Sequence, residues 1–260
     1  MAYLFMILHF STLPNGTGCA KIALKTYRRE NLLQQLWWRL VRLGFRLLYN
    51  EMAWSYDLVS WLASLGEWRA WQRGGLFYVK GTRVLEIAHG PGHMLLALAQ
   101  QQVEVIGLDL SRAMGRSAGR RLRRQAGEAR LVRGRAQSLP FAAASFDSVF
   151  ATFPTAFIAE QATMTAVYRV LRPGGRFVVV PEGHLTGRGP LQRFIGWLYT
   201  ITGQRSGTFA VNGEQYWPAD TPVWRAWQHQ MAAVGFRVAV EHVQLGPSGV
   251  TVVIAHKPSR

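Results

Sequence analysis

Two glycines and an aspartate in the middle of the chain have the spacing of a site for a ligand that contains a ribose. Gly90 and Gly92 follow an apolar segment in VLEIAHGPGH, residues 84–93. Glycines placed after a buried strand let the backbone approach a ligand at the carboxyl end of that strand. Asp109 ends the next apolar segment, VIGLDLS, residues 105–111. A carboxylate at this position can accept hydrogen bonds from both ribose hydroxyls.

Other nucleotide motifs fit these residues less well. A dinucleotide fingerprint would need a third small residue where Leu95 stands, and no Gly-Lys-Ser/Thr follows that would make a P-loop. Taken alone, Asp109 could also be a solvated acid at a strand end or a helix cap. Its position after the glycine turn favours the ribose interpretation.

Apolar segments alternate with amphipathic ones around these residues. This alternation is typical of an α/β domain whose parallel sheet is covered by helices on both faces. Near the C-terminus two further strands are joined by four residues, which predicts a hairpin. The predicted strands are residues 83–88, 104–110, 131–134, 148–152, 176–180, 236–245 and 249–255. The predicted helices are residues 93–101, a segment that Ser111 caps, and residues 161–170, 191–202 and 223–234.

The chain is expected to have three parts. Residues 1–30 fit no periodic pattern, and we expect a poorly ordered tail there. Residues 31–75 have helical periodicity and are expected to form an N-terminal helical lid. Residues 76–260 then form the domain that carries the chemistry, with a lid insertion at about 182–222, where the alternation pauses.

The lid is expected to contain two helices. Residues 31–49 place three arginines on one side and leucine and tryptophan on another. Such a basic amphipathic helix either packs on its own domain or lies on an anionic membrane surface. Residues 51–72 are predicted to form a single helix that ends before Gly74.

The composition limits the classes of protein to which this chain can belong. Basic residues outnumber acidic ones by thirty to fourteen, and this net charge of +16 favours anionic partners such as nucleic acid, acidic lipid or a phosphate-bearing ligand. The single cysteine, Cys19, excludes a disulfide framework and a cysteine-based zinc cluster, and we predict no metal site. It also fits a cytoplasmic location. The longest apolar run, Met1–Leu8, is far shorter than the ~20 residues of a membrane span.

Several motifs occur in order after the glycine turn. Together with Glu86, the glycines and Asp109, they resemble the class I S-adenosylmethionine-dependent methyltransferases over about residues 49–180. The motifs are GRAQSLPF (134–141), SFDSVFATF (145–153) and LRPGG (171–175). Residues 49–73, with the pairs Tyr56-Asp57 and Trp68-Arg69, are similar to the N-terminal helix of the ubiquinone/menaquinone-biosynthesis C-methyltransferases and their relatives, the methyltransferase type 11 group.

The resemblance implies a fold, a cofactor and a reaction. The fold would be a Rossmann-like sheet of seven strands, six parallel and one antiparallel, with helices on both faces and a helical lid. The cofactor would be S-adenosyl-L-methionine, with S-adenosyl-L-homocysteine as product. The methyl group would move to a small acceptor by in-line displacement, for which alignment supplies much of the acceleration. The Trp, Phe and Leu residues of the lid region favour a lipophilic acceptor, and core packing is the competing interpretation of the same residues. The residues expected to bind the cofactor are Tyr56, Glu86, Ala88, Gly90, Gly92, Asp109, Leu110, Met114, Ala136, Gln137 and Thr152.

Two features depart from the family pattern. The residues after Pro181 lack the tyrosine-rich pattern of the quinone enzymes, and the second departure is a single residue. Arg135 stands where these enzymes usually have an acidic residue that faces the adenine amino group. An arginine cannot accept a hydrogen bond. We therefore expect the backbone around Ala136 and Gln137 to take over this contact.

The catalytic residues are left open. A base is needed only if the nucleophile must lose a proton. Tyr56 and His184 are the candidates we retain, and His89, His93 and Glu182 are others. For each one a structural role is the competing interpretation: the two histidines shape the glycine turn, Tyr56 forms a wall of the site, and Glu182 and His184 are solvated loop residues.

Two other functions compete with methylation of a small molecule. A nucleic-acid methyltransferase could use the arginine-rich residues 112–135 to follow phosphates. The segment ATFPT, residues 151–155, lacks the Asn/Asp-Pro-Pro-aromatic motif of that class. No cysteine is available to attack a cytosine, because the single one, Cys19, lies in the expected N-terminal tail. A non-catalytic binding module would not need the intact glycines and Asp109. Contact with an anionic membrane remains an expectation, and the oligomeric state and the acceptor's identity stay open.

Overall fold

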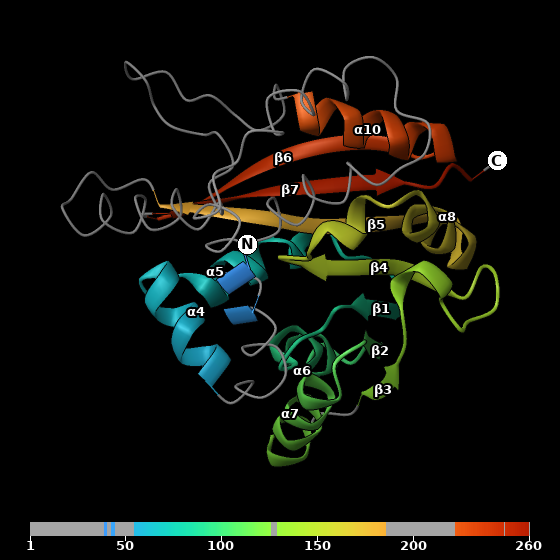
Figure 1. Ribbon diagram of the computed structural model, residues 1–260. Helices are drawn as coiled ribbons and strands as arrows, with labels where there is room; N and C mark the ends of the chain where they lie inside the picture. The colour runs from blue at the N-terminus through green and yellow to red at the C-terminus, as the bar shows by residue number, and fades with distance from the viewer. Residues whose placement is uncertain are drawn as a thin grey trace, which may run out of the picture.

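The described residues form one mixed sheet. The computed structural model describes residues 39–40, 43–44, 55–125, 129–185, 222–246 and 248–259. The strands are β1 (Arg83–Ile87), β2 (Glu104–Asp109), β3 (Arg130–Arg133), β4 (Phe146–Thr152), β5 (Leu171–Leu185), β6 (Arg237–Leu245) and β7 (Ser248–His256). Their order in the sheet is β3-β2-β1-β4-β5-β7-β6 (Figure 1). Six strands share one direction and β7 opposes its neighbours β5 and β6, which confirms the expected fold.

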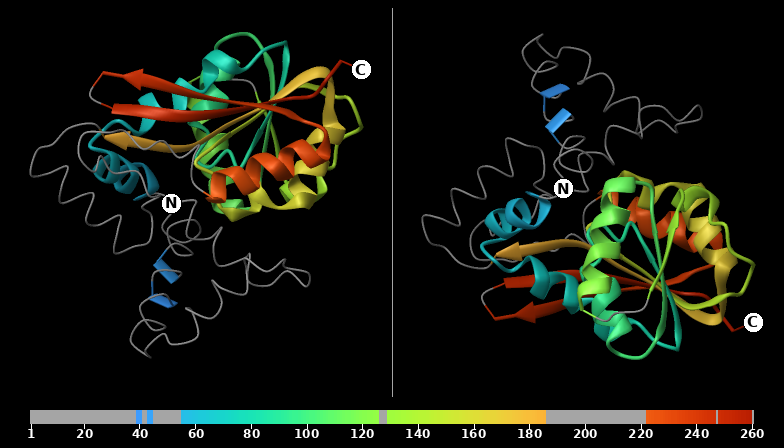
Figure 2. Two further views of the ribbon diagram at one scale, coloured as in Figure 1. Left: turned by 90° about the horizontal axis from the view of Figure 1, so that it is seen from above. Right: turned by 90° about the horizontal axis from the view of Figure 1, so that it is seen from below.

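Helices cover both faces of this sheet. Helices α8 (Gln161–Val170) and α10 (Pro222–Val234) lie together on one face, and α5 (Trp68–Gly74), α6 (His93–Ala99) and α7 (Arg112–Arg124) lie on the other (Figure 2). Successive strand residues point to opposite faces. In β1, Leu85 and Ile87 therefore join the core under α8 and α10, whereas Val84 joins the core under α5, α6 and α7.

The segment predicted as one helix, residues 51–72, is instead two helices. Helix α4 (Tyr56–Ser64) ends where Leu65 and Gly66 adopt positive φ angles of 53° and 89°. The Ser64 hydroxyl then accepts a hydrogen bond from Trp68 N, at 2.9 Å, where α5 begins. The single-helix prediction was wrong because a side chain at Leu65 gives no sequence signal for the left-handed conformation that ends α4.

Strand β5 is longer than predicted. Its pairing with β4 shifts register after Leu171, so that Pro173-Gly174-Gly175 forms an irregularity within the strand rather than a turn before it. At its other end, Glu182 and His184 pair with Thr251 and Gly249 of β7. The expectation that these two residues lie in a loop was wrong, because β7 provides backbone partners as far as Leu185.

Other predictions fall on residues that the structure does not describe. These are the tail at 1–30, most of the basic helix at 31–49, the helix at 191–202 and the insertion beyond residue 185. Within the described ranges, every helix is too short or too polar to cross a bilayer.

Helix α5 packs directly on the sheet because a glycine lies beneath it. Trp71 is only 2% exposed, and its ring lies over Gly183 of β5. A Cβ at Gly183 would lie 2.2 Å from Trp71 Cδ2, closer than any real contact. The glycine thus fixes how closely the lid helices approach the strand.

We expect Gly183→Ala to lower the free energy of unfolding by about 1–3 kcal/mol, because the added methyl group overpacks the contact with Trp71. Gly115→Ala is a matched control: Gly115 lies within α7 with nothing within 4 Å of its Cβ position. That change should stabilise the helix by up to about 1 kcal/mol. Urea unfolding measures both. An unchanged midpoint for Gly183→Ala would show that the close approach does not exist.

Candidate functional site

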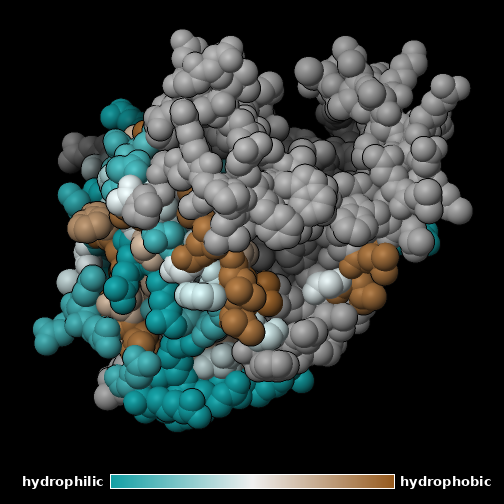
Figure 3. Space-filling view, turned by 90° about the vertical axis from the view of Figure 1, so that its left-hand side faces the viewer, coloured by the Kyte–Doolittle hydropathy of each residue, from teal (hydrophilic) through white to brown (hydrophobic). Residues whose placement is uncertain are grey.

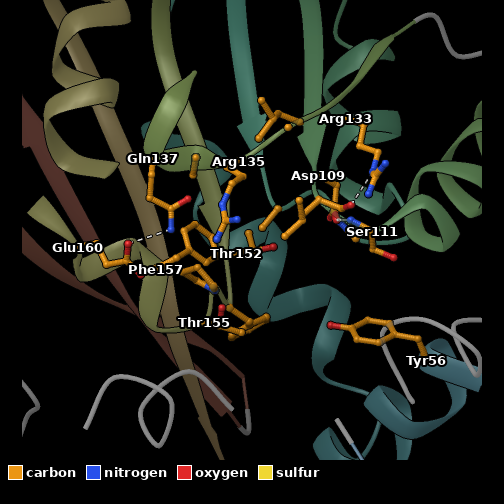
Figure 4. A pocket seen from close by; sticks show the side chains of 18 residues that line it. Tyr56, Asp109, Ser111, Arg133, Arg135, Gln137, Thr152, Thr155, Phe157 and Glu160 are labelled. Carbon is orange, nitrogen blue, oxygen red and sulfur yellow. Dashed lines mark hydrogen bonds between the residues drawn. The ribbon is translucent and has the colours of Figure 1, made fainter. Parts of the chain in front are cut away.

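A cavity of about 590 Å³ opens at the carboxyl ends of β1, β2 and β4 (Figure 4). The chain runs outward from β1 through β2 to β3, and then crosses back to β4 on the other side of β1. This reversal leaves a crevice between the loops that leave neighbouring strands, which is where open α/β sheets bind ligands. Tyr56 of α4 lies across the opening.

Asp109 is held in place by the glycine turn. Its Oδ2 accepts a hydrogen bond from Gly90 N at 2.9 Å, and its Oδ1 accepts one from Ser111 N at 2.8 Å. Each carboxylate oxygen has a second lone pair left. Gly90 has φ +54° and nothing within 4 Å of its Cβ position, so its backbone is open to a ligand. The carboxylate is therefore oriented and able to accept two more hydrogen bonds.

Two residues with strained backbones direct the chain out of the sheet at this cavity. Ala88 follows β1 with φ 54°, and Phe153 follows β4 with φ 47°. Their N–H groups donate to Leu108 O and Val180 O, both at 2.7 Å, before the chain turns away. A left-handed conformation costs a non-glycine residue roughly 1–2 kcal/mol. Such strain is characteristic of functional sites, and the sequence analysis did not find Phe153.

Glu86 lies in the core beneath the glycine turn. It is 1% exposed, and its Oε2 has no hydrogen-bond partner among the described residues. Burial, followed by the negative charge of Asp109, raises the pKa of Glu86 well above its ordinary value, although the N–H of Leu95 partly opposes this. Glu86 therefore keeps its proton at pH values where an exposed glutamate has lost it.

Asp57 ties the lid to the glycine turn. Its Oδ1 lies 2.8 Å from His93 Nε2 and its Oδ2 lies 2.6 Å from Arg121 Nη2. Arg121 also donates to the carbonyl oxygen of Pro91, inside the turn. The hydrogen bond from His93 is the largest of the effects that lower the pKa of Asp57 from 3.8 to about 2. The neighbouring Tyr56 is thereby fixed at the cavity.

The two histidines of the turn have structural surroundings. His89 is 5% exposed, its Nδ1 lies 2.7 Å from Gly90 O, and burial lowers its pKa. His93 bonds to Asp57, and neither histidine lines the cavity. These contacts favour the structural interpretation of both. The side chain of His184 lies outside the described part of the chain, so its candidacy stays a prediction.

The cavity brings together eight of the eleven residues predicted to bind a cofactor. Glu86, Gly92 and Met114 are not in its lining: Glu86 and Met114 are buried, and Gly92 turns the chain with φ +82° against Ala118. The sequence analysis missed several lining residues at the ends of β2, β3 and β4 or in the loops that follow them. For those next to a strand end, that position was the available signal. The missed lining residues are Ser111, Arg133, Gly134, Arg135, Phe153, Pro154, Thr155, Phe157 and Glu160.

An acidic group lies in the cavity although residue 135 is an arginine. Gln137 Nε2 donates to Glu160 Oε2 at 2.9 Å, which places the Glu160 carboxylate beside the segment after β3. The Arg135 side chain points into the cavity between these residues and Thr152 (Figure 4). Within the described residues it forms no ion pair.

The other end of the cavity is aromatic. Tyr56 and Phe153 line it, whereas Phe157 lies on the opposite side, beside Glu160 (Figure 4). Behind Tyr56 and Phe153, the ring of Trp68 lies 4.2 Å from that of Phe153 and 6.2 Å from that of Tyr56. The cavity thus joins a polar end at Asp109 to an apolar end suited to a flat, hydrophobic molecule.

Comparisons with known proteins agree on one kind of enzyme. A methyltransferase-domain family matches residues 84–175. A demethylmenaquinone methyltransferase from Thermus thermophilus is 31% identical over 79% of this chain and 98% of its own length. A ubiquinone/menaquinone biosynthesis C-methyltransferase from Geobacter sulfurreducens is 30% identical over 77% of this chain and 84% of its own. Several further relatives of the same kind align over little more than half of their length.

A solved structure shows the same fold. It is a phosphoethanolamine N-methyltransferase 2 from Haemonchus contortus in complex with S-adenosyl-L-methionine, with a TM-score of 0.51 at 17% identity. The similarity covers 74% of this chain and 53% of that one.

The raised pKa of Glu86 predicts a pH dependence of stability. Between the pKa of an unfolded glutamate, about 4.3, and the higher pKa of the native state, the native protein binds more protons than the unfolded chain. Stability therefore falls as pH rises, by up to ~1.4 kcal/mol per pH unit. Glu86→Gln, which resembles the protonated acid, should remove this slope, so its stability relative to the wild type should increase with pH. Urea unfolding at several pH values measures this, and a difference independent of pH would contradict it.

Proposed function

Since this chain belongs to the class I S-adenosylmethionine-dependent methyltransferases of the ubiquinone/menaquinone group, we propose that its acceptor is a lipophilic hydroquinone, methylated on a ring carbon. The enzyme is a methyltransferase and S-adenosylmethionine is its cofactor. The observation that carries the acceptor proposal is the two-ended cavity, with Asp109 and the glycine turn at one end and Tyr56 and Phe153, backed by Trp68, at the other. The names of the relatives from Thermus and Geobacter support the same acceptor class.

The residues present fit this cofactor. Asp109 would accept from the two ribose hydroxyls with the lone pairs left after its bonds to Gly90 and Ser111. The open backbone at Gly90 would adjoin the methionine part. Glu160, beside Gln137, would accept from the adenine amino group in place of the acid that Arg135 replaces. When bound, the cofactor supplies a methyl group that its sulfonium already activates.

The protein's own contribution is then alignment and exclusion of water. Tyr56 and Phe153 would hold a ring against the aromatic end of the cavity, and Asp57 fixes the helix that carries Tyr56. Orientation of two reactants in one site can supply a large part of the rate acceleration. The Tyr56 hydroxyl is the candidate to receive or relay a proton, because this side chain lies at the cavity.

Asp109→Ala should weaken cofactor binding on the order of 10²-fold, because it removes charge-assisted hydrogen bonds worth ~1.5–3 kcal/mol. Calorimetry with S-adenosylhomocysteine measures the affinity. Glu104→Gln is the control, since Glu104 begins the same strand at its far end, where it pairs with Arg83 at 3.2 Å. Equal affinity of Asp109→Ala and wild type would remove Asp109 from the site.

Phe153→Leu should raise the KM for the acceptor about 2- to 10-fold and leave cofactor affinity unchanged, because it removes an aromatic contact of about 0.5–1.5 kcal/mol but keeps an apolar side chain. The assay follows a labelled methyl group from the cofactor into a water-soluble naphthohydroquinone, with the methylated atom located by NMR. Phe141→Leu is the control, because Phe141 packs against Phe146, 5.1 Å between ring centres, away from the cavity. Cofactor binding without transfer to any hydroquinone would refute the acceptor class.

A further inference from the structure

A second hollow adjoins the cofactor cavity, between α7 and β3. Its volume is about 570 Å³, and it shares Asp109, Ser111 and Arg133 with the cavity. We call it the α7–β3 groove. Five arginines line it, and all five are exposed: Arg112, Arg116, Arg120, Arg123 and Arg133.

The positive charge of this region is almost unopposed. Residues 109–135 contain nine arginines and two acidic residues, Asp109, which lines the groove, and Glu128. Within the described part of the chain, Arg121 is the member of this set that forms an ion pair, with Asp57. The other eight arginine side chains repel one another. Bound anions would reduce this repulsion, because the fold places few acidic groups beside them.

The groove contains open space between its arginine side chains, which a solvated helix face would not require. Gly115 and Gly119 lie between the arginines, and the Cβ position of Gly115 has nothing within 4 Å. The glycines therefore leave space for a group between the long side chains. Leu131, in the groove, is 36% exposed, and Leu110, at the mouth of the cofactor cavity, is 54% exposed.

These features favour a lipid surface over nucleic acid. Proteins that bind single strands combine cations with aromatic side chains on which bases stack. The described lining of the groove contains no Phe, Tyr or Trp, and its one imidazole ring, that of His89, is only 5% exposed. It instead combines arginines with one exposed leucine, Leu131, and a second exposed leucine, Leu110, lies at the adjoining mouth of the cofactor cavity. Cations beside exposed leucines are typical of surfaces that meet headgroups and the acyl boundary. Figure 3 shows hydrophobic side chains near the middle of the face where the strands end, above a hydrophilic lower edge, where α7 lies in Figure 1.

We propose that the α7–β3 groove docks the enzyme on anionic phospholipid headgroups, with the mouth of the cofactor cavity at the bilayer. The shared residues Asp109, Ser111 and Arg133 keep the docked surface beside the cavity. The proposal rests on the proposed function in one respect: a lipophilic acceptor dissolves in the bilayer, and docking would bring the cavity to it. It is separate from the expected membrane contact of residues 31–49.

The test is co-sedimentation of the full chain with phosphatidylcholine vesicles that contain or lack phosphatidylglycerol. The variant combines Arg116→Gln, Arg120→Gln and Arg123→Gln, which line the groove but not the cofactor cavity. An arginine near an anionic surface contributes about fivefold in affinity, so the variant should bind on the order of 10²-fold more weakly. Binding of the wild type should also fall as salt shortens the Debye length from about 10 Å at 0.1 M to about 3 Å at 1 M.

The control variant removes the same charge elsewhere. Arg73→Gln, Lys80→Gln and Arg237→Gln change exposed cations of α5, the loop before β1 and the start of β6. This variant should bind vesicles like the wild type, and both variants should keep the wild-type melting temperature and affinity for S-adenosylhomocysteine. Equal loss in the two variants would reduce the effect to net charge and overturn the groove proposal, as would unchanged binding in the groove variant.

Two further arms separate the alternatives. A single-stranded oligonucleotide that binds more tightly than the anionic vesicles, through the same arginines, would overturn the lipid assignment in favour of nucleic acid. Inorganic phosphate at the same phosphate concentration should not displace the vesicles; displacement would show a site for free phosphate instead.

The vesicle experiment can fail or succeed independently of the proposed function. Vesicle binding needs no acceptor, so absence of methyl transfer to hydroquinones would refute the proposed function and leave this inference standing. If both hold, the groove variant should lose transfer to vesicle-bound acceptor but keep transfer to a soluble one.

Discussion

The hydrogen bond from Gly90 N to the Asp109 carboxylate joins the ends of β1 and β2, and the rest of the site is arranged around it. It exists because parallel neighbours end at the same edge of the sheet, so the loop after one strand meets the last residue of the next. The bond leaves each carboxylate oxygen a free lone pair, and it holds the glycine turn open at the cavity. A ligand therefore meets groups that are already oriented.

Several ionisable groups lie around this hydrogen bond. Beneath it lies Glu86, whose carboxyl group keeps a proton mainly because it is buried, and further because a second negative charge beside Asp109 would be costly. Above it, Asp57 is ionised and held by His93 and Arg121, so the lid is fastened to the same turn. Outside lies the α7–β3 groove, whose arginines are exposed to solvent. Burial thus keeps Glu86 neutral, whereas the hydrogen bond from His93 favours the charged form of Asp57.

In the proposed function, one end of the cavity holds the cofactor and the other end holds the acceptor. Strand ends supply the polar groups for the cofactor, and the aromatic side chains come from the lid and from the loop after β4. Because α5 packs closely on Gly183, Trp68 lies directly behind Phe153, with 4.2 Å between their ring centres. A closely packed hydrophobic wall beside the cofactor site suits a reaction that depends mainly on alignment.

The sequence by itself determined the strands, most of the helices, the C-terminal hairpin, the glycine turn and the place of Asp109. These follow from periodicity and from residue types next to one another, which a single chain displays directly. Only the tertiary structure decided the break at Leu65, the strained turn at Phe153 and the full length of β5, since these depend on backbone angles and on a partner strand. It alone brought Asp57 to His93 and Arg121, and Glu160 to Gln137. Such contacts join residues far apart in sequence, and no local pattern encodes which of them will meet.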